Sequence, residues 1–83
     1  MIKKQTISFF FIKKMILFRK KAQISQLKLS EIINCHVNTI NSIETGKQMP
    51  SIETAIKIAF ALNISIDDLI KEYSERFNLL EIE

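Results

Sequence analysis

The sequence predicts an all-α fold of five short helices, and three observations carry this prediction. The 83 residues include one glycine and one proline, so little of the chain is available for long loops. Apolar side chains recur at helical spacing in several segments. Ser25, Ser51 and Ser65 each precede such a segment, where a serine oxygen can accept the free amide hydrogens of a first helical turn. With 47% apolar and 25% charged residues, the chain is expected to fold as one small domain.

The first helix is expected over residues 12–22, where Met15, Phe18 and Ala22 recur at helical spacing and share an inner face. The residues before it, 7–12, form a run rich in Phe and Ile between lysine pairs. This run is far shorter than the roughly 20 apolar residues that a membrane-spanning helix needs, so no membrane partner is predicted. No Ala-x-Ala-like cleavage site follows it, which argues against a signal peptide.

Two interpretations of the first fourteen residues are open. In the first, residues 6–11 form a short strand or an extra helical turn that contributes to a dimer contact. In the second, Met15 is the biological start, and residues 1–14 are an upstream extension of uncertain role. The sequence does not choose between them.

The second and third helices are expected over residues 26–33 and 37–44, joined by a tight turn. Asn34 lies in this turn, where a left-handed backbone is needed and asparagine is the best-tolerated substitute for glycine. Gly46 ends the third helix, and Pro50 prevents its continuation. The side chains expected to face inward are Leu29, Ile32, Ile33, Ile40 and Ile43.

The fourth and fifth helices are expected over residues 52–62 and 66–73. Asn63 follows the fourth helix in the place of a terminal glycine, and Asp68 lies three residues after Ser65 in an arrangement close to a capping box. The inner side chains of the fourth helix are expected to be Ile52, Ala55, Ile56, Ala59 and Leu62. The tail, residues 74–83, carries apolar side chains that can pack on the N-terminal segment: Phe77, Leu79, Leu80 and Ile82.

Charge is unevenly distributed along the chain. Residues 1–47 hold nine Lys and Arg against two Glu, a net charge of +7, whereas residues 48–83 hold three Lys and Arg against seven Asp and Glu, a net charge of −4. A basic first half suits a polyanionic partner, and the acidic second half should face away from it. The chain leaves no room for a separate effector module, and no small-molecule ligand or cofactor is evident.

The single cysteine, Cys35, excludes an internal disulfide and fits a reducing cytoplasm. Beside it, His36 is the single histidine. One histidine and one cysteine are too few for a metal site, and adjacent side chains do not face together on one helix. Neither catalysis nor metal binding is therefore predicted.

The segment from Ser25 to Gly46 carries an ordered series of short motifs: Ser25-Gln26, Cys35, Thr39-Ile40 and Ile43-Glu44-Thr45-Gly46. This series resembles the core of the Cro/cI-type (XRE-like) helix-turn-helix regulators. Arg19, the segment Pro50-Ser51-Ile52-Glu53-Thr54 and the segment from Ile64 to Leu69 extend the resemblance over residues 15–72. It implies a five-helix, lambda-repressor-like DNA-binding domain over residues 15–73, with residues 1–14 and 74–83 as short extensions.

The resemblance implies six residues that contact double-stranded DNA: Gln26, Val37, Asn38, Asn41, Ser42 and Lys47. Asn38 can pair with adenine N6 and N7, which is worth about 1–3 kcal/mol of discrimination, and Val37 can pack on a thymine methyl group, so the site is expected to lean towards A·T pairs. Gln26 and Lys47 would contact phosphates. The resemblance also pairs Arg19 with Glu44 in a partly buried salt bridge that orients the third helix.

Several residues depart from the family pattern. His36 replaces the usual Ser or Thr before the third helix, so the start of that helix is expected to be looser. Val37 replaces a common polar or basic residue, and Lys28 replaces a glutamate that would complete a capping box. Leu27 and Phe60 occupy positions that are normally polar, which indicates a self-association patch. The candidates for self-association are Phe60 and Phe10.

These observations favour a small cytoplasmic transcriptional regulator that binds a palindromic operator as a homodimer, with half-sites about one helical turn apart. Repression is the default expectation, and activation stays open. The competing interpretation is a protein-interaction module on the same fold, such as an antitoxin or a co-regulator subunit, that uses Leu27, Phe60 and the N-terminal Phe-rich run. A membrane-surface role for that run is a third option.

Overall fold

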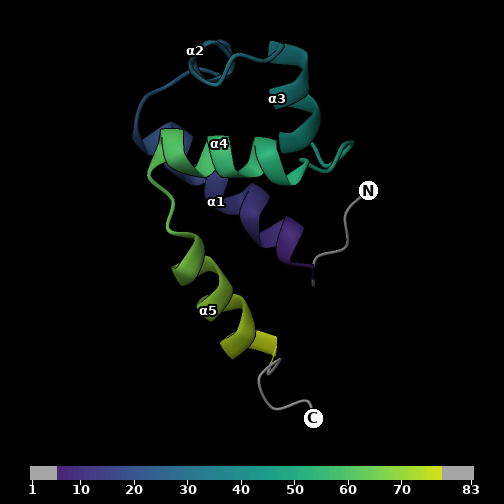
Figure 1. Cartoon of the computed structure of the whole chain (residues 1–83), viewed down its shortest axis with the longest axis vertical. Helices are drawn as coiled ribbons and strands as arrows, with labels where there is room; N and C mark the ends of the chain where they lie inside the picture. The colour runs from purple at the N-terminus through teal and green to yellow at the C-terminus, as the bar shows by residue number, and fades with distance from the viewer. Residues whose placement is uncertain (1–5, 78–83) are drawn as a thin grey trace.

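The computed structural model describes residues 6–77, which form five α-helices joined by short turns (Figure 1). No strand occurs in this part, so the predicted all-α fold is confirmed. None of its helices has the length and apolar content needed to cross a membrane. The helices are α1 (Ile7–Lys21), α2 (Gln26–Ile32), α3 (Val37–Glu44), α4 (Ile52–Leu62) and α5 (Ile66–Phe77).

Hydroxyl side chains cap four of the five helix starts. The oxygens of Thr6, Ser25, Ser51 and Ser65 each accept the backbone N–H three residues further on, at 2.9 to 3.1 Å. The three serine caps were predicted and are confirmed, whereas the cap at Thr6 was not predicted. His36, which precedes α3, makes no side-chain cap bond, so the first turn of that helix lacks this source of stability.

The first helix begins five residues earlier than the sequence indicated, because Thr6 caps a start at Ile7. The Phe-rich run is therefore helical, and the interpretation as a strand is wrong. Phe11 and Ile12 are buried and extend the core beyond the turn that carries Met15. Ala22, expected inside, is exposed because α1 ends at Lys21 and the chain turns away there.

The turns between helices use left-handed backbone conformations. Asn34 and Asn63 both have φ of 59°, as expected for asparagines in the place of glycine, and Gly46 has φ of 77°. Gln23 also has φ of 59°, which the sequence did not suggest. These residues redirect the chain between successive helices, so that α3, α4 and α5 pack against α1 while α2 packs against α3 and α4.

The core is formed around α1, which packs against α3, α4 and α5 (Figure 1). Three side chains expected inside, Ile32, Ile52 and Ile56, are exposed. The correction on α4 has a simple cause: the helix turns Ile58 inward together with Ala59 and Leu62, and this face leaves its other isoleucines outside. The largest fully buried apolar side chains are Met15, Leu29, Ile40, Ile43 and Ile58.

The fifth helix extends to Phe77, four residues beyond the predicted end, and its last turns pack on the beginning of α1. The rings of Phe10 and Tyr73 meet edge to face with centroids 5.4 Å apart, and the Arg76 guanidinium lies 5.6 Å from the Phe10 ring centroid. Lys14 and Glu72 form an ion pair at 2.9 Å. Leu79, Leu80 and Ile82 lie outside the described residues, as does the side chain of Phe77, of which the structure describes only the backbone, so the predicted packing of this tail stays a prediction.

Candidate nucleic-acid interface

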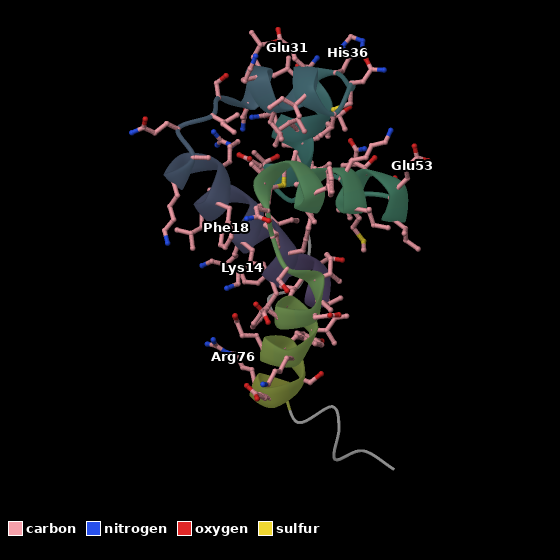
Figure 2. The ribbon with its side chains drawn as sticks, turned by 60° about the vertical axis from the view of Figure 1, so that its left-hand side comes forward. Lys14, Phe18, Glu31, His36, Glu53 and Arg76 are labelled. Carbon is pink, nitrogen blue, oxygen red and sulfur yellow. The ribbon has the colours of Figure 1, made fainter. Side chains whose placement is uncertain are left out.

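The helices α2 and α3 and their turn form one end of the molecule. Figure 2 shows Glu31 and His36 together at this end, far from Arg76 at the other. The turn is closed by backbone hydrogen bonds, among them the N–H of Cys35 donating to the carbonyl of Ser30 at 2.9 Å. This bond closes the turn between α2 and α3, which pack against each other. Two packed helices joined by a tight turn are the arrangement in which one helix can enter a DNA groove while the other crosses the backbone.

One side of α3 is anchored in the core and the opposite side is open. Ile40 and Ile43 are fully buried on the inner side. The open side is largely polar and spans the eight residues of the helix. A helix with its side chains is about 10–12 Å across, which fits the roughly 12 Å width of the major groove. The four predicted base-contacting residues share this side, with Asn38 and Asn41 exposed and Val37 and Ser42 half-buried.

A two-pronged ion pair fixes the C-terminal end of α3 to α1. Arg19 Nε donates to Glu44 Oε2 at 2.7 Å and Arg19 Nη2 donates to Glu44 Oε1 at 3.0 Å. The side chains are 11% and 6% exposed, respectively, so water screens the pair weakly. Arg19 Nη1 also donates to the carbonyl of Ile24 at 2.9 Å, which ties the chain just before α2 into the same arrangement. The planar guanidinium thus joins three segments at once.

The ion pair continues into the open side of α3 through Gln26. Gln26 Nε2 donates to Glu44 Oε1 at 2.9 Å, and Gln26 Oε1 accepts from Asn41 Nδ2 at 3.4 Å. The first bond is short and holds the Gln26 amide in one orientation, whereas the second lies at the long limit for a hydrogen bond. Asn41 is therefore positioned by Gln26 and can exchange this weak bond for one to a ligand.

Lys47 lies just beyond α3, at the edge of the same surface. Its N–H and that of Gln48 donate to the carbonyl of Ser42 at 2.9 and 3.2 Å, and the Thr45 hydroxyl donates to the carbonyl of Asn41 at 2.9 Å. These bonds satisfy carbonyls at the end of the helix that would otherwise lack partners. Within residues 6–77 the Lys47 ammonium has no ion-pair partner, so its charge is open to solvent.

Comparison with known proteins assigns this arrangement to a family. The family model described as "Helix-turn-helix" matches residues 15–69, which is more than half of the chain. The chain belongs to the Cro/cI-type (XRE-like) helix-turn-helix family. This is a family of DNA-binding regulators. No curated protein and no solved structure matches the chain.

The helix-turn-helix match covers only part of each of the two outer helices, α1 and α5. It begins at Met15, inside α1, and ends at Leu69, inside α5. The contact of Phe10 with Tyr73 and Arg76 therefore lies beyond the matched segment and lengthens the family fold at one end. The division into residues 1–14, 15–73 and 74–83 stays a prediction, since α1 and α5 each run across one of its boundaries.

The helix-turn-helix family explains the ion pair but not every contact around it. The bond from Gln26 to Glu44 and the bond from Arg19 to the Ile24 carbonyl were missed at the level of sequence. The residues in the first bond are 18 positions apart, and no local pattern relates them. The one available signal is that Gln26 is a polar residue at the first position of a capped helix.

The single cysteine lies in the turn of the helix-turn-helix unit and is half-buried. Burial raises the pKa of the Cys35 thiol above its ordinary value of 9.0, and the positive charge of Lys57 opposes this shift. The thiol is thus protonated near neutral pH, and its sulfur donates a long bond of 3.5 Å to the carbonyl of His36. In the described part of the chain, no group of three or more His, Cys, Asp or Glu could hold a metal ion.

Proposed function

We propose that this protein is a transcriptional regulator that binds double-stranded DNA sequence-specifically, with α3 in the major groove. The observation that carries the proposal is the two-sided character of α3. Its inner side is buried through Ile40 and Ile43, and its outer side presents Asn38 and Asn41 to solvent. A helix held this firmly, with planar amides on its open side, suits the reading of base edges.

The base contacts proposed are those of the open side of α3. Asn38 pairs with adenine, because one amide can donate to N7 and accept from N6 in a single plane. Val37 packs against a thymine methyl group, and Asn41 and Ser42 reach neighbouring bases or phosphates. The preferred site is therefore rich in A·T pairs at the positions that these residues meet.

Phosphate contacts flank the base contacts. Gln26 is held at the start of α2 by Glu44, and Lys47 is exposed just beyond the end of α3, so the two residues flank the open side. The charge of the chain supports this arrangement, since the half that carries α2 and α3 is basic and the other half is acidic. Each phosphate contact by a cation releases a condensed counterion, so binding should weaken steeply with salt.

The regulator acts as a homodimer in the cytoplasm, on a palindromic operator with half-sites about 34–36 Å apart or a multiple of that. Repression follows if the operator overlaps a promoter, because bound protein blocks polymerase. A competing function, a protein-interaction module such as an antitoxin or co-regulator subunit, is favoured by one observation: Leu27 and Phe60 are both exposed.

Selection of bound sites from a random DNA library tests the proposal. We expect an enriched two-fold symmetric site whose affinity falls by orders of magnitude between about 50 and 200 mM salt. Binding of Lys47→Gln should show a shallower salt dependence, whereas the matched variant Lys71→Gln, on exposed α5, should bind as the parent does. No enrichment, together with salt-insensitive binding of a protein partner, would favour the competing function.

A further inference from the structure

The outer side of α4 carries an apolar stripe. Ile52, Ile56 and Phe60 are 81%, 58% and 90% exposed, and their four-residue spacing places them in one row along the helix. Neighbouring exposed apolar side chains of this kind, one of them an aromatic ring, are typical of surfaces that bind a partner. This stripe is therefore an interaction surface, and we define the α4 stripe as these three residues.

An acid and a base border the α4 stripe along one side. Glu53 and Lys57 form an exposed ion pair at 3.0 Å within the helix. Their order matters for a second copy of the same helix. When two identical helices pack antiparallel about a two-fold axis, the same edge of each helix lies along the other, with the sequence running in opposite directions. The acidic residue of one copy then lies opposite the basic residue of the other.

We infer that the α4 stripe is the contact between two copies of this chain, packed antiparallel about a two-fold axis near Ile56. Ile52 then meets the partner's Phe60, and Glu53 faces the partner's Lys57. The inference rests on the proposed function for its purpose, since a two-fold operator needs a two-fold protein. It adds the surface, the direction of the helices and the charge pairing that the proposed function leaves open.

The chemistry of the α4 stripe fits a second copy better than it fits DNA. Phe60 offers nothing to a phosphate, and the exposed Glu53 carboxylate would repel one. Figure 2 shows Glu53 on a part of the molecule apart from Glu31 and His36, which mark the end formed by α2 and α3. The stripe consists of three apolar side chains, whereas a stable complex buries roughly 800 Å² on each partner, so we expect association to be weak in solution and stronger on an operator.

Two charge variants of the full chain, mixed together, test the inference. The Glu53→Lys chain carries lysine at both border positions and the Lys57→Glu chain carries glutamate at both, so each alone repels its own copy. We expect each to associate less than the parent in sedimentation equilibrium between about 1 μM and 1 mM, and an equimolar mixture to form the mixed dimer. Within each variant helix the two like charges still repel each other in the mixture. If association recovers in the mixture, the recovery must therefore come from opposite charges that meet between chains.

A second pair of variants tests the apolar stripe. Phe60→Ser should raise the dissociation constant of the dimer about tenfold or more, because the symmetric contact loses two buried rings. Ile70→Ser, which removes an exposed isoleucine from α5, should change it by less than about twofold. Circular dichroism establishes that each variant is folded before its association is compared.

The outcomes separate this inference from the proposed function. A parent chain that selects a symmetric site, while the charge mixture shows no recovery and Phe60→Ser associates normally, would overturn the α4 contact and leave the regulator standing. A parent that is monomeric over the whole concentration range, on and off DNA, would also overturn the contact. Conversely, a charge-dependent dimer with no enriched DNA site would overturn the regulator and support the α4 contact.

Discussion

The helices α3 and α4 each bury one side in the core and expose the other, but their exposed sides differ in chemistry. On α3 the open side carries Asn38 and Asn41, and the helix is tied down at its end by an ion pair. On α4 the open side carries Ile52 and Phe60. The ion pair beside them joins two exposed residues of α4 itself, Glu53 and Lys57, and does not attach the helix to the rest of the fold. The contrast teaches that exposure alone does not name a partner: planar amides suit base edges, whereas a water-exposed ring suits another apolar surface.

The largest effect is expected from a substitution that removes the ion pair between α1 and α3. Replacing Arg19 with alanine leaves the Glu44 carboxylate buried without its cation, and should lower the free energy of unfolding by about 3–5 kcal/mol. DNA binding should weaken for all sequences alike, because α3 loses its fixed position. Urea denaturation followed by circular dichroism measures the effect.

The control is Lys14→Ala, which breaks the more exposed pair with Glu72 and should cost less than about 1 kcal/mol. Equal losses for the two variants would show that the pair with Glu44 is no more than a surface interaction.

A second prediction sharpens the two sides of α4. Ile58→Ala removes a fully buried side chain and should destabilise the fold by about 2–5 kcal/mol. Ile56→Ala, two residues away on the open side, should change the stability of the monomer by less than about 0.5 kcal/mol. Thermal unfolding at low protein concentration measures both. A cost at Ile56 as large as that at Ile58 would mean that the open side is covered within the monomer.

A third prediction concerns the open side of α3. Asn38→Ala should reduce the preference for the matching base pair by about 1–3 kcal/mol while leaving non-specific binding and stability nearly unchanged. Competition between the selected site and single-base variants measures this preference. Loss of all binding together with unfolding would contradict the assignment of Asn38 to the DNA surface, since an exposed side chain should not hold the fold together.

The smallest expected effect concerns Cys35, in the turn between α2 and α3. The positive charge of Lys57, on α4, acts on the pKa of its thiol. Because burial raises the pKa of this thiol, less of it is thiolate at a given pH, and alkylation by iodoacetamide should reach half its maximal rate above pH 9.0. Lys57→Gln removes a charge that lowers the pKa, so the midpoint of the pH–rate profile should move further upward. An unchanged midpoint would place Lys57 too far from the thiol to act on it.

The sequence-based predictions were more accurate for α3 than for α4. The bounds of α3 and α4 were predicted correctly, since Ser51 marks the start of α4 and Asn63 and Gly46 mark the ends of the two helices. The inward sides were correct for α3, which has two isoleucines and needs both inside. For α4 the prediction was correct at Ala59 and Leu62 but wrong at Ile52 and Ile56, and it missed Ile58. Apolar residues occur all round this helix, so periodicity does not show which of its isoleucines are buried.

The start of α1 was missed for a related reason. The Phe-rich run over residues 7–12 is apolar at five of its six positions, so it shows no helical period, and the signal for a start at Ile7 is the capping hydroxyl of Thr6. Of the candidate site, the pairing of Arg19 with Glu44 could be predicted from resemblance to a family. The link through Gln26 could not, because it depends on how α2 and α3 meet in space. The contacts with DNA stay predictions.

The carboxylate of Glu44 is shared between two side chains, and this separates the residues of α2 and α3 that are bonded to one another from those that are not. It binds Arg19, which holds the fold, and Gln26, which leads to Asn41, so none of these residues can change alone without disturbing the others. Asn38 and Val37 make no side-chain bond to this group among the described residues. On the proposed function, substitutions at those two positions would change the operator preference without disturbing the side chains bound to Glu44.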